Sequence, residues 1–337
     1  MIEDRQADKT VIVRLRNFVG DVVLGIPALR LLERHGYRLQ LIGKGWAPAL
    51  LEAEERWAVQ VRPKKLGDRV AQLKALRREA RARQPDFDRQ ANAIALPWSF
   101  SAALEMRLAG LKGVGYAHEA RGWLLHRSYA MPAPGHALLN YWELACRFLG
   151  VDEPPPAEIG MKVSAAQRAA AAQLLAQHGV DEPYLLICPF AGGTFEVLDK
   201  TWPRFADFVE LAAARGLRLL VCPGPGEEEA ATRQYPKALS LPGVKLGVYA
   251  ALLQRAALVV SNDTGPAHVA AAVGGRVLSV LGPTKPELWA PWGAQVDVLR
   301  QYPEWLGPEA VLARAEALLA GAAPSGGAWS FCMPPAA

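Results

Sequence analysis

Residues 261–284, SNDTGPAHVAAAVGGRVLSVLGPT, decide the fold that this sequence predicts. The short apolar run Leu258–Val260 leads into them and predicts a buried strand. Asp263–Gly265 follow where a parallel strand passes into a helix, and Pro266 suits the first helical turn because its missing N–H costs nothing there. Such a helix start has free backbone N–H groups and the positive end of the helix dipole, which favour a phosphate. With His268 in the same first turn, the stretch predicts a nucleotide or phosphate site.

Short β-rich runs alternate with amphipathic runs along the whole chain, which is typical of a parallel α/β sheet. We expect strands at Val11–Leu15, Leu39–Ile42, Ala91–Leu96, Tyr184–Cys188, Leu217–Cys222, Leu258–Val260 and Val277–Leu281. We expect helices at Asp21–Arg34 (interrupted by Pro27), Val70–Arg83, Ser101–Leu108, Ala165–Gln177 and Pro308–Leu319, and a turn at Gly113–Gly115. The prolines of VDEPPPAEIG, residues 151–160, form a stiff connector between two similar halves. The sequence therefore predicts two Rossmann-like domains that face a cleft, residues 1–155 and 156–320, with a loose tail at 321–337.

The composition fits a globular protein with an anionic partner. The length of 337 residues is enough for two domains, and the hydrophobic fraction of 51% argues against disorder. The formal net charge of +5 favours an anionic partner without naming one. The opening MIEDRQADKT predicts no signal peptide, and no run of about eighteen apolar residues could span a bilayer, so we expect a cytoplasmic protein.

The cysteine pattern predicts no metal site. Cys146, Cys188, Cys222 and Cys332 lie far apart, without a Cys-x-x-Cys motif or a Cys/His cluster, so we expect no structural zinc. Cys188 and Cys222 lie in apolar, strand-like runs, which favours buried free thiols over a disulfide.

The loops that follow the predicted strands are the places to search, because ligands bind beyond the carboxyl ends of open α/β sheets. In Arg16–Asp21, Gly20 permits a close turn and Asp21 has two interpretations. Asp21 as a helix N-cap is worth about 1 kcal/mol, and the local sequence favours this interpretation. Asp21 as a carboxylate at the cleft would be a general base.

Two further loops carry candidate phosphate or sugar contacts. In Pro189–Pro203, Thr194 and the preceding glycines can wrap a phosphate while Lys200 supplies a point charge; a surface loop fits this sequence equally well. In Pro223–Glu229, the three glutamates suit the first turn of a helix, and one of them could instead bind a ribose or sugar hydroxyl.

The segment Arg62–Arg89 holds ten Lys or Arg residues against four acids. A solvated helix face is the usual explanation. The alternative is a contact surface for acidic lipid headgroups or a phosphorylated acceptor. No nucleic-acid motif or aromatic platform accompanies the charge, so we expect no nucleic-acid partner.

These motifs resemble a known family. The segment Asn262–His268 with Gly282–Thr284 resembles the hallmark of the ADP-heptose:lipopolysaccharide heptosyltransferases, glycosyltransferase family nine. The opening VIVRLRNFVGDVVLGIPALRLL, residues 11–32, resembles that family's first strand, Gly-Asp turn and proline-containing helix. Lys200–Pro203 resembles its Lys-x-Trp-Pro motif, and Leu96–Phe100 with Gly113–Tyr116 resembles its middle region. The resemblance extends from about Val11 to about Trp292.

The resemblance implies a GT-B fold with the acceptor on the N-terminal domain, the nucleotide sugar on the C-terminal domain and a last helix able to pack back on the N-terminal one. It implies an inverting transfer of heptose from ADP-heptose to an inner-core sugar of lipopolysaccharide, with no essential metal or cofactor. It also implies an anionic glycolipid acceptor at the inner-membrane surface. Asp21 would be the base and Lys200 would neutralise the departing diphosphate. The implied donor-binding residues are Thr194, Glu227, Asp263, Thr264, Gly265 and His268.

Other functions fit parts of the pattern. The same enzyme class could use another nucleotide sugar or another glycan or protein acceptor. The family's arginine before the lysine is absent from Phe195–Asp199, and the turn Pro223–Gly226 is compressed, which leaves donor identity open. A non-catalytic nucleotide-sugar or glycan binder is a third hypothesis, but it has little need of both Asp21 and Lys200. The Asp-Thr-Gly-Pro-x-His segment gives no support to an epimerase that acts without an acceptor.

Overall fold

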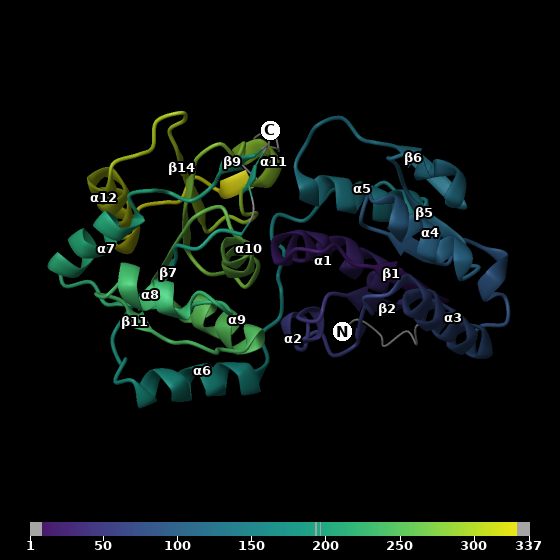
Figure 1. Ribbon diagram of the computed structural model, residues 1–337, viewed down its shortest axis with the longest axis horizontal. Coiled ribbons are helices and arrows are strands. Elements are labelled where there is room, and N and C mark those ends of the chain that lie inside the picture. The colour runs from purple at the N-terminus through teal and green to yellow at the C-terminus, as the bar shows by residue number, and fades with distance from the viewer. Residues whose placement is uncertain (1–8, 193, 196, 329–337) are drawn as a thin grey trace. The chain divides into compact units, whose positions relative to one another are not determined.

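The computed structural model describes residues 9–192, 194–195 and 197–328. Contacts between Cα atoms divide the chain into two compact units, Met1–Pro155 and Pro156–Ala337 (Figure 1). Among the described residues, no helix is both long enough and apolar enough to cross a membrane.

The first unit contains a six-stranded parallel sheet in the order β3-β2-β1-β4-β5-β6. Its strands are β1 (Lys9–Arg14), β2 (Tyr37–Gly43), β3 (Ala58–Val61), β4 (Ala93–Ala95), β5 (Gly113–Ala117) and β6 (Arg127–Ala130). Its helices are α1 (Val19–Arg34), α2 (Ala47–Leu50), α3 (Leu66–Arg83), α4 (Phe100–Leu108) and α5 (Ala137–Leu149), with 3-10 turns η1 (Phe87–Arg89) and η2 (Arg121–Leu124). The central strands β1 and β4 are buried from Thr10 to Arg14 and from Ala93 to Ala95, because helices cover both faces of a parallel sheet.

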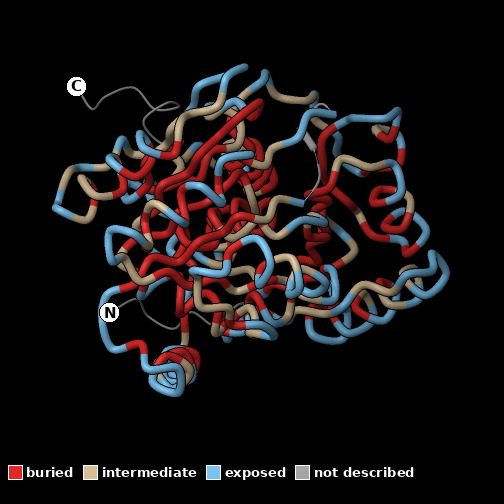
Figure 2. Tube along the Cα trace, turned by 60° about the vertical axis from the view of Figure 1, so that its left-hand side comes forward, coloured by how far each residue is buried: buried red, intermediate tan, exposed pale blue. Residues whose placement is uncertain are grey.

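The helices of the first unit form two layers. Right-handed crossovers place α1 and α2 on one face of the sheet and α3 and α4 on the other. The packing agrees, because α1 contacts α5 whereas α3 contacts α4 and α4 contacts η2. Beneath α3 and α4, side chains such as Leu76, Phe87 and Met106 form a buried core with the sheet. The buried residues follow the strands and the inner sides of the helices (Figure 2).

The second unit contains another six-stranded parallel sheet, in the order β11-β10-β7-β12-β13-β14. Its strands are β7 (Leu185–Cys188), β10 (Leu219–Val221), β11 (Leu239–Ser240), β12 (Leu258–Ser261), β13 (Val277–Leu281) and β14 (Val296–Arg300), and an antiparallel pair is formed by β8 (Thr194–Phe195) and β9 (Leu198–Asp199). Its helices are α6 (Ala165–Gln177), α7 (Phe205–Ala214), α8 (Glu228–Gln234), α9 (Leu246–Arg255), α10 (Gly265–Ala272), α11 (Pro286–Trp289) and α12 (Pro308–Leu319). In its core, Phe205 packs edge to face against both Trp202 and Phe208.

The C-terminal tail differs from the sequence prediction. It follows α12, whose apolar side lies in the core of the second unit, against α7 and β12. The loose tail is wrong for residues 321–328. The N–H groups of Ser325 and Gly326 bond to Asp297 Oδ1 and the Val296 carbonyl, both at 2.9 Å, and Ala328 is fully buried. The remainder of the predicted tail lies outside the described residues.

Two local predictions in the first unit are also wrong. The glycine-rich Gly113–Gly115 forms the start of β5 rather than a turn, because neighbouring strands supply its hydrogen bonds. Helix α1 continues through Pro27 without interruption.

Cys146, Cys188 and Cys222 are free thiols, and burial raises the pKa of Cys188 to about 12.

Candidate active site

Asp21 lies in the first turn of α1, and its carboxylate is bound to side chains rather than to the helix end. The helix begins at Val19 after the N-cap Phe18, so the N-cap interpretation of Asp21 is wrong. The Asp21 side chain is only 6% exposed. Its Oδ1 accepts hydrogen bonds from the Tyr141 hydroxyl at 2.7 Å and from Arg16 Nε at 3.3 Å. Its Oδ2 has no protein partner among the described residues and remains available to a ligand.

Tyr141 reaches Asp21 because α5 packs against α1. The phenol is fully buried, and burial together with the Asp21 carboxylate raises its pKa well above the ordinary value. Tyr141 therefore keeps its proton beyond the pH at which an ordinary phenol ionises, and donates it to Asp21. The local sequence gives no signal for this contact, because 120 residues separate the two side chains.

Arg16 connects Asp21 to an aromatic cluster. Its guanidinium carbon lies 4.9 Å from the centre of the Trp98 ring, and this ring lies 6.3 Å from that of His118. A cation held against an aromatic face in this way gains about 0.5–1 kcal/mol. The loops after β1, β4 and β5 thus bring Arg16, Trp98 and His118 to the carboxyl edge of the first sheet.

A second cluster of charged side chains at this edge carries more positive than negative charge. Arg14 Nε and Arg69 Nη1 share the buried Glu105 carboxylate, at 3.1 and 3.2 Å. Burial and the nearby Arg62 guanidinium lower the pKa of Arg14 to about 10. Three cations facing one carboxylate leave this edge able to attract an anion.

In the second unit, Lys200, Asp263 and Thr284 meet in one polar cluster. Asp263 Oδ2 lies 3.2 Å from Lys200 Nζ and accepts a 2.5 Å hydrogen bond from the Thr284 hydroxyl. Asp263 and Thr284 are buried, and the Lys200 side chain is 16% exposed. Three loops that are distant in sequence therefore converge at the carboxyl edge of the second sheet.

Asn262 fastens both ends of the loop Pro189–Pro203, which carries Lys200, to the end of β12. Its Oδ1 accepts from the Trp202 backbone N–H at 3.1 Å, and its Nδ2 donates to the Pro189 carbonyl. Its own backbone N–H bonds to Cys188 at the end of β7. Because Asn262 is completely buried, these bonds fix the position of Lys200, two residues before Trp202.

Helix α10 begins beside this cluster. Thr264 is its N-cap residue, Gly265 its first residue, and both are partly exposed. The Thr264 side chain makes no cap bond, and His268 is buried one turn further along the helix. The predicted phosphate contact Thr194 lies in β8, but its side chain and Gly193 lie outside the described residues.

Sequence reasoning missed the residues that support the Gly282–Thr284 turn. Arg300 Nε donates to the carbonyls of Gly282 and Thr284, both at 3.0 Å. A Cβ atom at Gly282 would lie 2.2 Å from the Trp305 ring, so this position requires glycine. Gly282 was visible in the sequence, but Trp305, whose ring lies against it, is 23 residues further along the chain.

Glu227 stabilises its own turn. Its Oε2 accepts the Gly224 backbone N–H at 2.8 Å, and Glu228 Oε2 accepts that of Gly226 at 2.7 Å. The first-turn interpretation therefore holds for Glu228, whereas a sugar contact by Glu227 stays a prediction. Within the described ranges, no group of three or more His, Cys, Asp or Glu side chains is arranged to hold a metal ion.

Residues 75–318 match the family described as "Glycosyltransferase family 9 (heptosyltransferase)". The chain belongs to this family. It is 32% identical over 205 residues to lipopolysaccharide heptosyltransferase 1 of Salmonella typhimurium, an alignment that covers 57% of this chain and 61% of that protein. A shorter match, to a lipopolysaccharide heptosyltransferase 3 of Escherichia coli, spans 35% of that relative's length.

Solved structures of the family share the fold. The E. coli ADP-heptose lipopolysaccharide heptosyltransferase II superposes with a TM-score of 0.76 at 22% identity, over 93% of this chain and 98% of that one. The E. coli heptosyltransferase WaaC with ADP superposes with a TM-score of 0.67 at 24% identity, over 91% of this chain and 99% of that one. The predicted family and its GT-B fold are confirmed.

Proposed function

We propose that this family member is an inverting glycosyltransferase that moves a heptose from ADP-heptose to an inner-core sugar of lipopolysaccharide. The relatives named above are lipopolysaccharide heptosyltransferases, and one solved relative holds ADP. The single observation that carries the proposal is Asp21, a buried carboxylate with Oδ1 held by Tyr141 and Arg16 and with Oδ2 available. This is the arrangement that a general base requires.

In the proposed reaction, Asp21 Oδ2 removes the proton from the acceptor hydroxyl as its oxygen attacks the anomeric carbon. The bond from that carbon to the diphosphate oxygen breaks on the opposite face, so the configuration inverts. The electron pair leaves with the diphosphate, and the proton remains on Asp21. Tyr141 and Arg16 act as positioning residues that orient Oδ2.

Positive groups in the second unit would stabilise the leaving group. Lys200 and the backbone N–H at the start of α10, with Thr264 and Gly265, supply charge and donors to the diphosphate oxygens. Asp263 positions Lys200, and we assign Thr194, Glu227 and His268 to the donor as well. The proposal needs no metal or cofactor, because these groups supply the positive charge.

The acceptor in this proposal is an anionic glycolipid at the inner face of the inner membrane. The excess of guanidinium groups around Glu105, from Arg14, Arg62 and Arg69, would meet its phosphates or acidic sugars. Reversing the charge of Arg62 should raise the KM for the acceptor and leave the donor affinity unchanged. An unchanged KM would mean that Arg62, in the loop between β3 and α3, is an ordinary solvated surface residue.

The test is Asp21→Asn, which removes the base and keeps the size of the side chain. Turnover should fall by about 10²–10⁴-fold, the usual contribution of acid–base catalysis, while ADP binding stays nearly intact. Equal loss of ADP binding would contradict the role. A thermal-shift screen of ADP, UDP, GDP and dTDP species addresses the alternative donors, because a ligand at about 100 times its Kd stabilises the fold by about 2.7 kcal/mol.

A further inference from the structure

Helix α4 exposes an apolar ridge. Phe100, Leu104 and Leu108 are spaced by four residues and therefore lie on one side of the helix. Phe100 is 36% and Leu108 50% exposed, and Leu104 is partly buried. The opposite side, with Ala102 and Met106, packs on the sheet. A surface helix normally has polar residues on its outer side, so this ridge is an unusual feature of a free surface.

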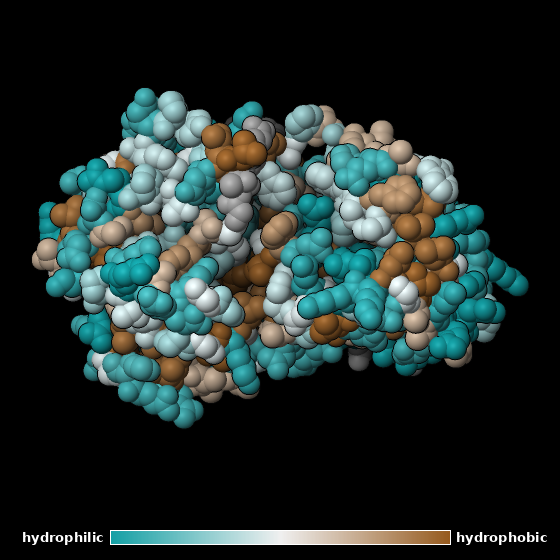
Figure 3. Space-filling model, viewed as in Figure 1, coloured by the Kyte–Doolittle hydropathy of each residue, from teal (hydrophilic) through white to brown (hydrophobic). Residues whose placement is uncertain are grey.

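The turn η2 extends the ridge with a tryptophan. Trp123 is 73% exposed, and its ring centre lies 6.4 Å from that of Phe100. We call Phe100, Leu104, Leu108 and Trp123 the α4 ridge. Figure 3 shows hydrophobic side chains gathered over the region of α4 and η2, next to the hydrophilic surface of α3.

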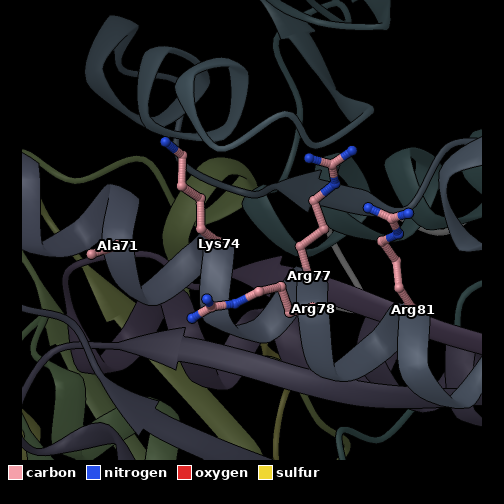
Figure 4. Close-up of a pocket in the computed structure, with 5 residues that line it drawn as sticks. All are labelled: Ala71, Lys74, Arg77, Arg78 and Arg81. Atoms are coloured by element: carbon pink, nitrogen blue, oxygen red, sulfur yellow. The ribbon is translucent and has the colours of Figure 1, made fainter.

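The neighbouring helix α3 presents cations. Lys74, Arg77, Arg78 and Arg81 line a surface pocket of about 380 Å³, and Lys74, Arg77 and Arg81 extend in one direction (Figure 4). Asp88 pairs with Arg77 and Arg81, at 2.8 and 3.3 Å. Within the described chain, Lys74 and Arg78 have no acidic partner.

The charge is confined to one layer of the first unit. Helix α3 has six Lys or Arg residues and two acids, a formal charge of +4. On the other face of the sheet, α1 has two basic and two acidic residues and α5 has one of each, so both are neutral. The basic segment seen in the sequence thus has two parts: Arg62 and Arg69 lie near Glu105, whereas Lys74–Arg81 continue along α3 for up to about 18 Å beyond Arg69.

We propose that the α4 ridge and the cations of Lys74–Arg81 form a docking face for an anionic lipid bilayer. Exposed apolar side chains with an aromatic residue, flanked by cations, match the interfacial zone of a membrane, where tryptophan is enriched and cations are attracted to anionic headgroups. A second copy of this chain is a poor occupant, because two such basic faces would repel each other.

Docking deepens the proposed function by bringing the acceptor to the base, and in this respect it rests on that function. The α4 ridge begins at Phe100, just beyond the carboxyl end of β4. Asp21 follows β1, the strand paired with β4, at the same edge of the sheet. A bilayer held on this face therefore presents a lipid-linked acceptor near the edge that carries Asp21.

The test is co-sedimentation of the full chain with vesicles, in the absence of donor and acceptor. Phosphatidylcholine vesicles with about 30% phosphatidylglycerol should bind the protein, and pure phosphatidylcholine vesicles should bind it at least tenfold more weakly. Trp123→Ser should weaken binding about tenfold. Lys74→Gln combined with Arg78→Gln should weaken it about 25-fold, at about fivefold per charge.

Matched controls come from the second unit. Tyr302→Ser removes an aromatic side chain that is 40% exposed, and Lys237→Gln with Lys245→Gln removes two exposed cations. These variants should bind vesicles like the unaltered protein, and all variants should keep their melting temperature and ADP binding. Because no transfer is measured, a failure of docking is distinguishable from a failure of the proposed reaction.

Three results would overturn docking. Equal binding to both kinds of vesicle would show that the cations of Lys74–Arg81 do not contribute to docking. Unchanged binding by both first-unit variants would assign membrane binding to another surface. A dimer in sedimentation velocity that Trp123→Ser dissociates would make the α4 ridge a contact between copies of the chain.

Discussion

Replacing Tyr141 with phenylalanine tests whether the buried hydrogen bond to Asp21 positions the base. The substitution removes one hydroxyl and keeps the ring that packs between α1 and α5. Asp21 Oδ1 would lose its 2.7 Å donor and keep only Arg16, at 3.3 Å. Oδ2, which has no protein partner in the part of the chain that the structure describes, would then be free to turn away from the acceptor.

The size of the effect follows from the type of bond. A hydrogen bond to a charged group contributes about 1.5–3 kcal/mol, and the retained Arg16 contact places the loss near the lower value. A loss of about 1.5 kcal/mol corresponds to roughly a tenfold decrease in kcat.

A matched control separates positioning from stability. Tyr116 is also fully buried, and its hydroxyl donates to the Asn140 carbonyl of α5 at 2.8 Å. Tyr116→Phe should lower the melting temperature about as much as Tyr141→Phe, but should keep kcat. The assay is steady-state transfer to a soluble acceptor fragment, with ADP affinity measured alongside. Equal kcat values for the two variants would refute the positioning role.

Three other substitutions test separate contacts. Lys200→Ala should weaken ADP binding at least tenfold in calorimetry, since a charge-assisted contact is lost; an unchanged Kd would exclude a role at the diphosphate. Gly282→Ala should cost about 1–3 kcal/mol of stability, measured by urea unfolding, because the new Cβ would lie 2.2 Å from the Trp305 ring; a wild-type midpoint would contradict this overpacking. Asp297→Asn tests how stability depends on pH. Burial raises the pKa of Asp297, but hydrogen bonds from Arg314 and Ser325 outweigh this effect, so the net shift of the pKa is downward. Its stabilisation is therefore present above the unfolded pKa of about 4 and lost as the pH falls through the lower folded value, so the melting temperatures of variant and wild type should differ at pH 7, and this difference should decrease as the pH falls below about 4.

The sequence predicted the elements whose signal is local. Helix Ala165–Gln177 and strand Val277–Leu281 have the predicted bounds, because a capping box at Ser164 marks the helix and an unbroken apolar run marks the strand. Helix Ala137–Leu149 was not predicted, although it carries Tyr141. Its apolar face is meaningful only against α1, which is more than 100 residues earlier in the chain.

The same distinction applies to the candidate site, where single residues could be predicted and their partners could not. Motifs indicated Asp21, Lys200 and Asp263, because strand-end loops with these residue types are visible in the sequence. The partner of each side chain was not visible. Asp263 binds Lys200 and Thr284, and its contact with Thr284 exists only because β12 and β13 lie side by side.

The bond between Lys200 and Asp263 has a consequence for turnover. A free lysine at a helix start would hold any diphosphate tightly, including the product. Here the carboxylate of Asp263 is already 3.2 Å from the ammonium group, so it competes with a bound diphosphate for the same charge. In the proposed reaction, this competition weakens the binding of ADP after the sugar has been transferred. Since product release limits many enzymes, the acid that neutralises Lys200 would shorten the time for which spent nucleotide occupies the protein.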